Sequence, residues 1–182
     1  LAVAIDNVTG SVYFGGANKI TKTTHSATIG KLNIDGTLAW TRSLSSSTAG
    51  EEKIHSLACD SSGNVYGAGY CDNAGYTTGS RDYLICKYNS SGTLQWQRMV
   101  GDTRFEQGDG ITVDSSDNVF VTGYSVDPFS SYDPVVFKFN SSGTLQWQNL
   151  HKDFTYQQSW YSRGIVTDSS GNIYFGGQHY NA

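Results

Sequence analysis

Hydrophobic and polar residues alternate over short stretches of this chain, and no stretch of useful length repeats apolar residues at the spacing of a helix. The stretches are rich in β-branched and aromatic residues, and clusters of Gly, Asn, Asp and Ser separate them. This pattern is typical of β-strands joined by tight turns. The sequence therefore predicts an all-β protein without helices.

The predicted strands recur in groups of four, which we label a to d in chain order. Strand a is expected at Ala2–Ile5, Ser56–Cys59, Ile111–Val113 and Gly164–Thr167. Strand b is expected at Ser11–Gly15, Asn64–Gly69, Asn118–Gly123 and Asn172–Gly176. Strand c is expected at Ala27–Asn33, Asp82–Tyr88 and Asp133–Phe139. Strand d carries a Trp four residues after a Gly, at Trp40, Trp96 and Trp147. The pattern thus reads a-b-c-d three times and a-b once more.

One motif recurs in these groups at a constant spacing. The second copy reads Asp-Ser-Ser-Gly-Asn-Val-Tyr from Asp60, and related copies begin at Asp6, Asp114 and Asp168, each 54 residues from the next. A fixed period of this length indicates a repeat architecture. The units span about residues 1–55, 56–109, 110–163 and 164–182. Because a copy of the turn offers one Asp, or two in the copy from Asp114, and a calcium site needs several carboxylates, a turn role is favoured over a calcium site.

A four-stranded antiparallel sheet repeated at this period is typical of the blade of a β-propeller. The sequence then holds about three and a half blades in one partial propeller domain, residues 1–182. The first unit already has four strands and the last has only a and b, so the two cannot complete each other. We therefore expect further blades of a longer chain, or another subunit, to complete the propeller. The Trp of strand d is expected to pack between neighbouring blades.

Composition and charge narrow the possible functions. Charged residues make up 15% of the chain and the formal net charge is −4, with no basic cluster, which argues against nucleic-acid binding. No apolar run has the length of a membrane span, so no membrane insertion is expected. The sequence opens on Leu1 within a strand pattern and without a signal peptide, which suggests a processed or partial chain. No motif indicates a cofactor or a metal ion, and neither is predicted.

The three cysteines, Cys59, Cys71 and Cys86, lie in one repeat. An odd number at this spacing is neither a disulfide framework nor a zinc signature. Buried free thiols are therefore expected, with a Cys59–Cys86 or Cys71–Cys86 bridge as the alternative.

The connections between the predicted strands are of two kinds. The a–b and c–d turns are nearly identical between copies, whereas the b–c and d–a loops vary in length and content. In a propeller both variable classes lie at the same end of every blade, and loops on a rigid scaffold often carry function. We therefore expect ligand or partner contacts at this end, through Tyr76, Arg81, Arg104, Phe105, Phe129, Tyr132, Phe154, Tyr156, Trp160 and Tyr161. The last four suit stacking on a sugar or a peptide, and the alternative is that they cap a blade.

Three chemically different residues share one position of the 54-residue register. His55, Asp109 and Arg163 each stand just before the predicted strand a. Together they could form an active constellation, and the alternative is that they are solvated loop residues.

Several motifs carry a resemblance to a known family. They are Asp60–Tyr66 with Gly69 and Tyr70 after it, Asp82–Tyr88, and Ser91–Trp96, and the last two recur at Asp133–Trp147. In these features the sequence resembles the seven-bladed β-propeller repeat family often called SBBP repeats, over nearly its whole length. The resemblance implies a secreted, cell-surface or virion protein, in which such repeats act as display or adhesion modules.

Three functions are compatible with these observations. The first is a non-enzymatic propeller acting as a structural, display or binding module, with a protein or glycan partner. The second is a glycan-active hydrolase or lyase that uses carboxylates and a histidine near the propeller channel, with Glu52, Glu106, Asp109 and His55 as candidates. The third is a purely structural part of an oligomer, which needs no ligand site.

Overall fold

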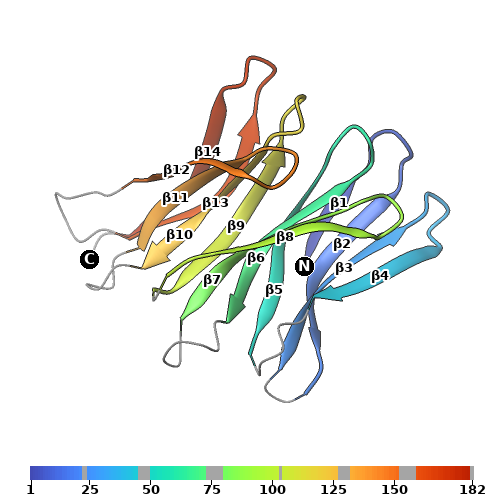
Figure 1. Ribbon diagram of the computed structural model, residues 1–182, viewed down its shortest axis with the longest axis horizontal. Helices are drawn as coiled ribbons and strands as arrows, with labels where there is room; N and C mark the ends of the chain where they lie inside the picture. The colour runs from blue at the N-terminus through green and yellow to red at the C-terminus, as the bar shows by residue number, and fades with distance from the viewer. Residues whose placement is uncertain are drawn as a thin grey trace.

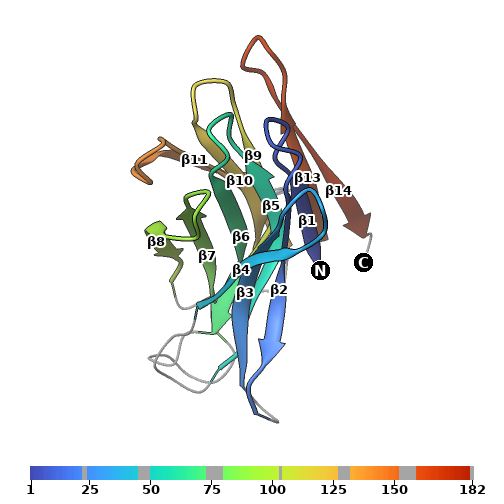
Figure 2. The ribbon, with the colours of Figure 1, turned by 90° about the vertical axis from the view of Figure 1, so that its right-hand side faces the viewer.

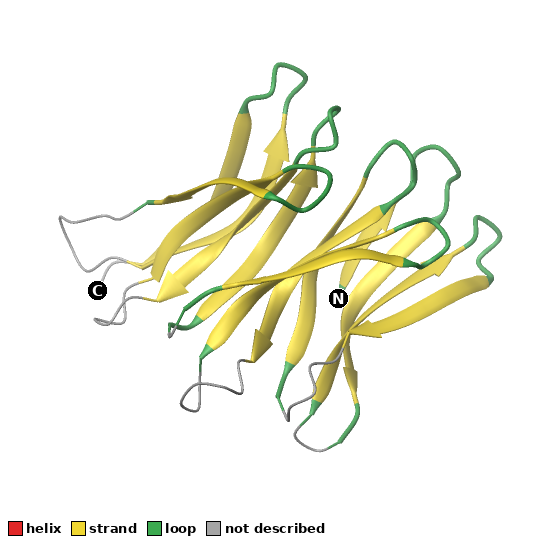
Figure 3. Ribbon diagram, in the orientation of Figure 1, coloured by secondary structure: helices red, strands yellow, loops and turns green. Residues whose placement is uncertain are grey.

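The computed structural model describes residues 1–21, 24–44, 50–72, 80–102, 104–126, 132–151 and 159–180. Within these ranges the regular structure is entirely β-strand, as Figure 3 shows. The expected all-β fold without helices is therefore confirmed for the described residues. None of these residues belongs to a helix of the length and hydrophobicity that crossing a membrane would need.

The strands form four antiparallel sheets that follow the predicted groups. The first sheet contains β1 (Ala2–Ile5), β2 (Val12–Lys19), β3 (His25–Leu32) and β4 (Leu38–Leu44). The second contains β5 (Glu52–Cys59), β6 (Val65–Asp72), β7 (Arg81–Tyr88) and β8 (Leu94–Val100). The third contains β9 (Glu106–Val113), β10 (Val119–Val126), β11 (Tyr132–Phe139) and β12 (Leu145–Leu150). The fourth pairs β13 (Ser159–Thr167) with β14 (Ile173–Tyr180).

The sheets lie one after another in chain order, from blue to red in Figure 1 and in the rotated view of Figure 2. Their first strands, β1, β5, β9 and β13, approach one another from sheet to sheet. The described part of the chain does not close into a ring. The four-stranded antiparallel units predicted from the sequence are thus confirmed, and the closed propeller stays a prediction.

The repeated turns form as their residues require. Asp60 Oδ1 accepts hydrogen bonds from the backbone N–H groups of Ser62 (3.0 Å) and Asn64 (2.9 Å), and Gly63 adopts a left-handed φ of 75°. Asp114 and Asp168 accept the same pair of bonds in their own turns. These short-range bonds confirm the turn role of the motif. The a–b and c–d turns gather at one end of the sheets, at the upper side of Figure 3.

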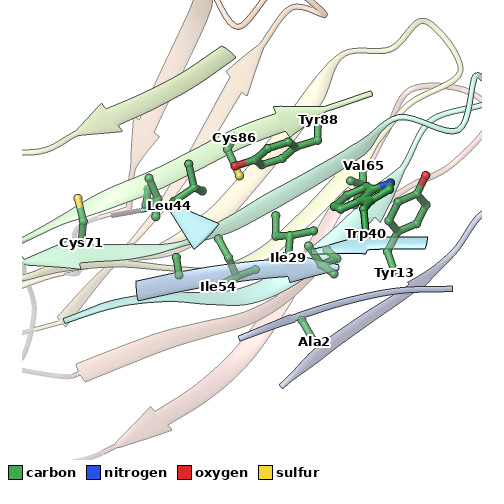
Figure 4. Close-up of a cluster of buried hydrophobic side chains, with 13 residues drawn as sticks. Ala2, Tyr13, Ile29, Trp40, Leu44, Ile54, Val65, Cys71, Cys86 and Tyr88 are labelled. Carbon is green, nitrogen blue, oxygen red and sulfur yellow. The ribbon is translucent and has the colours of Figure 1, made fainter. Parts of the chain in front are cut away.

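Hydrophobic side chains fill the spaces between the sheets. Figure 4 shows the cluster between the first two sheets, with Trp40, Tyr13, Ile29, Ile54 and Val65 among its members. A second cluster joins the second and third sheets, and a smaller one joins the third and fourth. Trp40 and Trp96 are about nine-tenths buried between neighbouring sheets, which confirms their expected role.

The three cysteines are free thiols, as expected, and the alternative of a disulfide bridge is wrong. Cys71 and Cys86 are buried, and Cys59 is partly buried. Burial raises the pKa of each thiol to about 12.

The predicted limits of strand a are wrong in three of the four units. The strands start earlier than expected, so Glu52, His55, Glu106, Asp109 and Arg163 lie on strands and not in loops. Each of these strands contains a register shift, between Ile54 and Ser56, opposite Thr122 and Gly123, and between Ser162 and Gly164. A bulge interrupts the alternation of side chains without ending the strand. The prediction, which relied on this alternation, therefore placed the start of each strand after the bulge.

Candidate functional site

Strand c of one sheet runs beside the segment that leads into the next sheet. Arg81, the first residue of β7, forms a parallel bridge with Phe105, and His25 at the start of β3 forms the same kind of bridge with Glu51. The backbone N–H of Val126 also donates to the carbonyl of Phe105 (2.9 Å). This connection brings residues of neighbouring repeats together at the end of the sheets opposite the tight turns.

Arg81 is held between two aromatic rings and two carboxylates. Its guanidinium carbon lies 3.9 Å from the ring centre of Tyr70 and 4.7 Å from that of Phe105, which are cation–π distances. Its Nε atom lies 3.0 Å from Asp72 Oδ1, and Nη2 lies 3.2 Å from Glu51 Oε2. The side chain is 23% exposed, so it is fixed in place and still reaches solvent.

Three tyrosines extend this group of rings towards the fourth sheet. The rings of Phe105 and Tyr124 are stacked, 6.3 Å apart and inclined by 14°. Tyr124 meets Tyr132 edge-on at 5.2 Å and Tyr161 at 5.3 Å, and the rings of Tyr132 and Tyr161 lie 4.4 Å apart. Tyr124 is buried, whereas the other rings are partly exposed. We call Arg81, Phe105, Tyr124, Tyr132 and Tyr161 the aromatic–arginine surface.

The three residues that share one register position are brought together. His55 Nδ1 lies 2.9 Å from Asp109 Oδ1, and Arg163 Nη1 lies 3.9 Å from Asp109 Oδ2. Gln107 Nε2 donates a hydrogen bond to Asp109 Oδ1 (2.7 Å). The Asp109 side chain is 4% exposed, against 57% for Arg163. The reading as solvated loop residues is therefore wrong for Asp109, because the bulge in β9 turns its side chain into the space between sheets.

These two groups are joined by further contacts. His55 meets the Tyr70 ring edge-on at 5.4 Å, and the Arg163 guanidinium lies 5.6 Å from the Tyr161 ring centre. Together the contacts form a closed cycle, in which each residue contacts the next and the last contacts the first. The order is His55, Tyr70, Arg81, Phe105, Tyr124, Tyr161, Arg163 and Asp109. Side chains of the second, third and fourth sheets thus form one connected patch.

The candidates chosen from the sequence divide into four sets. Arg81, Phe105, Tyr132 and Tyr161 come together in the aromatic–arginine surface. Arg104 instead pairs with Asp102, with Nη2 and Oδ2 2.8 Å apart. Trp160 lies on β13, beside Tyr161. Four candidates lie outside the described residues: Tyr76, Phe129, Phe154 and Tyr156.

Sequence reasoning missed Tyr70 and Tyr124. Both follow a Gly at the end of strand b, so they were assigned to the repeated scaffold. The sequence nevertheless contained a signal for them, because a tyrosine occurs at the same register position in both repeats, next to the variable b–c loop.

Glu106 lines a separate cavity between the second and third sheets. The cavity has a volume of about 160 Å³, and Tyr83, Gly101, Arg104 and Ser125 also line it. Glu106 Oε2 accepts a hydrogen bond from the backbone N–H of Asp102 (3.1 Å), and Oε1 accepts one from Ser125 Oγ (3.2 Å). Burial, and then the negative charge of Asp102, raises the pKa of Glu106 to about 7. The carboxyl group therefore holds or releases a proton near neutral pH.

Gly101 lies close to this carboxyl group. A Cβ atom at Gly101 would collide with carboxylate oxygens of Glu106 and Asp82. The Tyr83 hydroxyl is buried and accepts or donates no hydrogen bond within the described part of the chain.

Among the described residues, no group of three or more His, Cys, Asp or Glu side chains is arranged to hold a metal ion.

Comparison with known proteins adds information on the fold. No family model matches the sequence, and no curated protein matches it. The structure is similar to the 1.35 Å crystal structure of a protein of unknown function from Bacteroides caccae, with a TM-score of 0.55 and 13% identity. The match covers 94% of this chain and 56% of that one, so this chain spans little more than half of its neighbour. At this identity the likeness shows the fold alone. The chain is thus an all-β protein of repeated four-stranded antiparallel sheets.

Proposed function

We propose that the chain is part of a β-propeller of the SBBP-repeat type and acts as a non-enzymatic binding or display module. Sheets of four antiparallel strands that follow one another in chain order support the propeller. In this proposal further blades, from a longer chain or another subunit, complete the ring. The module belongs to an extracellular, cell-surface or virion protein, and it holds a glycan or protein partner at the end opposite the tight turns.

The observation that carries the binding proposal is the aromatic–arginine surface. Tyrosine and arginine are enriched where proteins bind partners, because they combine a large apolar area with hydrogen-bonding groups. Here one guanidinium and four rings are held by contacts with one another, so little side-chain freedom is lost when a ligand binds. This arrangement suits the flat apolar face of a sugar ring, with polar groups at its rim.

The charge of the surface restricts its ligand. Arg81 is paired with both Asp72 and Glu51, so these three residues together carry a negative charge. A strongly anionic ligand would be repelled by this excess. We therefore infer that a neutral glycan is the favoured partner, ahead of an acidic one.

Binding of neutral oligosaccharides to the wild-type chain, followed by calorimetry on the strongest ligand, tests the proposal. Phe105→Ala and Tyr132→Ala should each weaken binding about two- to tenfold, because each removes a stacking ring worth about 0.5 to 1.5 kcal/mol. Ile34→Ala is the matched control, since Ile34 is 78% exposed in a tight turn of the first sheet. Equal affinities for all four proteins would overturn the proposal, as would the absence of glycan binding by the wild type.

The second candidate function is a glycan-active hydrolase or lyase, and the environment of Glu106 favours it. A carboxyl group that holds a proton near pH 7 beside a cavity can serve as a general acid. A screen of aryl glycosides and polysaccharides would reveal turnover, which Glu106→Gln should abolish. Asp35→Asn is the control because Asp35 lies in an exposed turn and is not among the candidate carboxylates. Absence of turnover by the wild type, or equal turnover by both variants, would exclude this candidate.

A further inference from the structure

A buried tyrosine hydroxyl lines the cavity between the second and third sheets. Tyr83, on β7, is 1% exposed, and within the described residues its hydroxyl has no hydrogen-bond partner. Its ring packs edge-on against Phe137 at 4.8 Å, which fixes the position of the hydroxyl. Buried polar groups are normally paired, because an unpaired one costs free energy. The Tyr83 hydroxyl therefore points to a ligand that supplies a hydrogen bond.

Glu106, on β9, brings a carboxyl group to the same cavity from the third sheet. It is 6% exposed, and its oxygens accept hydrogen bonds from the Asp102 backbone and the Ser125 hydroxyl. Each carboxylate oxygen has two lone pairs, so both can accept a further bond. Burial, and then the negative charge of Glu106, raises the pKa of Tyr83, so the phenol keeps its proton. Because both residues line one small cavity, one ligand can contact both.

The charge around the cavity favours a cation. Arg104 is the one basic residue among the described side chains that line it, and its Nε and Nη2 atoms lie 2.8 to 3.1 Å from the carboxylate of Asp102. Within the same residues Glu106 forms no ion pair. Burial, and then the charges of Asp102 and Asp82, raises the pKa of Glu106 to about 7. A cation would offset this excess of negative charge, whereas an anion would be repelled.

The size and the walls of the cavity favour an organic cation over a metal ion. Its volume of about 160 Å³ is close to that of an engineered apolar cavity that binds benzene, so a molecule of about six non-hydrogen atoms fits it. Val100, Val135 and Leu150 provide an apolar wall beside the polar groups. In the part of the chain that the structure describes, no cluster of three or more His, Cys, Asp or Glu could hold a metal ion. The expected ligand therefore has a charged end and an apolar end.

We propose that this cavity binds a small primary ammonium ion with a short apolar chain, as in an alkylamine or the side chain of a lysine. The ammonium group donates hydrogen bonds to the Glu106 carboxylate and the Tyr83 hydroxyl oxygen. The carbon chain lies against Val100, Val135 and Leu150. The amine thus takes the place of the proton that Glu106 otherwise holds. This site is separate from the aromatic–arginine surface, and its ligand goes beyond the glycan proposed above.

Calorimetric titration of the 182-residue chain with n-butylamine at pH 8 tests the proposal. 1-Butanol is the matched control ligand, because it has the same carbon chain and no charge. The amine should bind at least tenfold more tightly than the alcohol, because hydrogen bonds between charged groups are stronger than neutral ones. Equal affinities for the amine and the alcohol would overturn the proposal. No binding of the amine at high millimolar concentration would overturn it as well.

The pH dependence of binding reports on the Glu106 proton. An alkylamine stays protonated below about pH 9, so its affinity should rise about tenfold from pH 5 to 6 and level off above pH 8. Titrations in buffers that differ in heat of ionisation should show release of nearly one proton per amine at pH 6 and almost none at pH 8.5. A number of released protons that does not change with pH would contradict the proposal.

Other charged and titratable groups surround Glu106. They are Asp82 and Tyr83 on β7, Asp102 and Arg104 before β9, and Asp133 on β11. The hydrogen bond from Arg104 lowers the pKa of Asp102, and burial raises that of Tyr83, so neither group titrates between pH 6 and 8.5.

Two variants remove the polar contacts and keep the shapes of the side chains. Glu106→Gln should weaken amine binding at least tenfold at pH 8 and abolish the proton release. Tyr83→Phe should weaken binding about two- to tenfold, while its melting temperature stays equal to or above that of the wild type, because the hydroxyl that it removes is buried and unpaired among the described residues. Asp35→Asn, in an exposed turn, is the control and should bind as the wild type does. Unchanged binding in either cavity variant would overturn the proposal.

Nα-Acetyl-lysine methylamide distinguishes the two sources of the ammonium group. If it binds more tightly than n-butylamine, the ligand is a lysine of a partner protein, and the reverse order identifies a free amine. Both results support the proposal. Displacement of n-butylamine by potassium chloride at equal concentration would instead show a site for any cation and overturn it. None of these measurements uses a glycan or depends on turnover, so this proposal and the proposed function can fail independently.

Discussion

His55 Nδ1 lies 2.9 Å from Asp109 Oδ1, although the two residues are 54 positions, or one full repeat, apart in the sequence. Equivalent residues of neighbouring repeats therefore touch, because both stand at the bulge of the first strand of their sheet. The bulge turns these side chains out of the regular alternation and towards the adjacent sheet. Arg163, at the third copy of the bulge, approaches the other oxygen of the same carboxylate.

Asp109→Ala is expected to lower the free energy of unfolding by about 1 to 3 kcal/mol. The change leaves the His55 imidazole and the Gln107 amide without their shared acceptor in a mostly buried setting. Urea titration monitored by circular dichroism would measure the loss. Asp35→Ala is the control, because Asp35 accepts hydrogen bonds in an exposed turn. If the free energy of unfolding falls by the same small amount in both variants, the His55–Asp109 contact does not stabilise the fold.

Glu106 is expected to make the protein less stable as the pH rises from about 5 to 8. The ordinary pKa of 4.5 is raised to about 7 in the folded state, so the folded protein binds the proton more tightly than the unfolded chain. The stability contribution is complete below pH 4.5 and is lost as the pH rises through 7, by at most about 3 kcal/mol. Unfolding titrations of the wild type and Glu106→Gln at each pH would measure it. The difference between the two proteins should change across this window, and a constant difference would contradict the prediction.

Gly92→Ala is expected to cost about 2 to 4 kcal/mol of unfolding free energy. Gly92 has a φ of 79°, and a Cβ there would lie 2.7 Å from the Trp40 ring. Gly36→Ala is a close control, because Gly36 has a φ of 82° in the equivalent turn and nothing within 4 Å of the added Cβ. That variant should lose about 1 kcal/mol, from the backbone alone. Equal losses would mean that the Trp40 contact does not constrain the turn.

The three thiols are expected to resist modification in the folded protein. Burial raises each thiol pKa to about 12, which lowers the reactive thiolate at pH 8 roughly a thousandfold below that of an ordinary cysteine. Titration with a chromogenic disulfide reagent should detect no fast-reacting thiol in buffer and three in denaturant. A fast thiol in the native protein would contradict this. Cys59→Ala would then show whether the partly buried Cys59 is responsible.

The sequence by itself determined the strands, the tight turns and their grouping by four. These features depend on local chemistry, such as the acceptor oxygens of Asp60 and the left-handed backbone of Gly63, so they can be recognised within a few residues. The position of Trp40 and Trp96 between sheets followed from the same period. The choice of Arg81, Phe105, Tyr132 and Tyr161 followed from the contrast between constant turns and variable loops.

Only the tertiary structure decided which of these side chains contact one another, how deeply each is buried and how its pKa is changed. The bulges at His55 and Asp109 interrupt the alternation of hydrophobic and polar residues, so the sequence pattern missed the part of each strand that precedes the bulge. Tyr124 joined the candidate site because the fourth sheet brings Tyr161 against it. The raised pKa of Glu106 and the exposed indole of Trp147 likewise depend on what an adjacent sheet covers. Burial is a property of packing between distant segments, and no local stretch of sequence contains it.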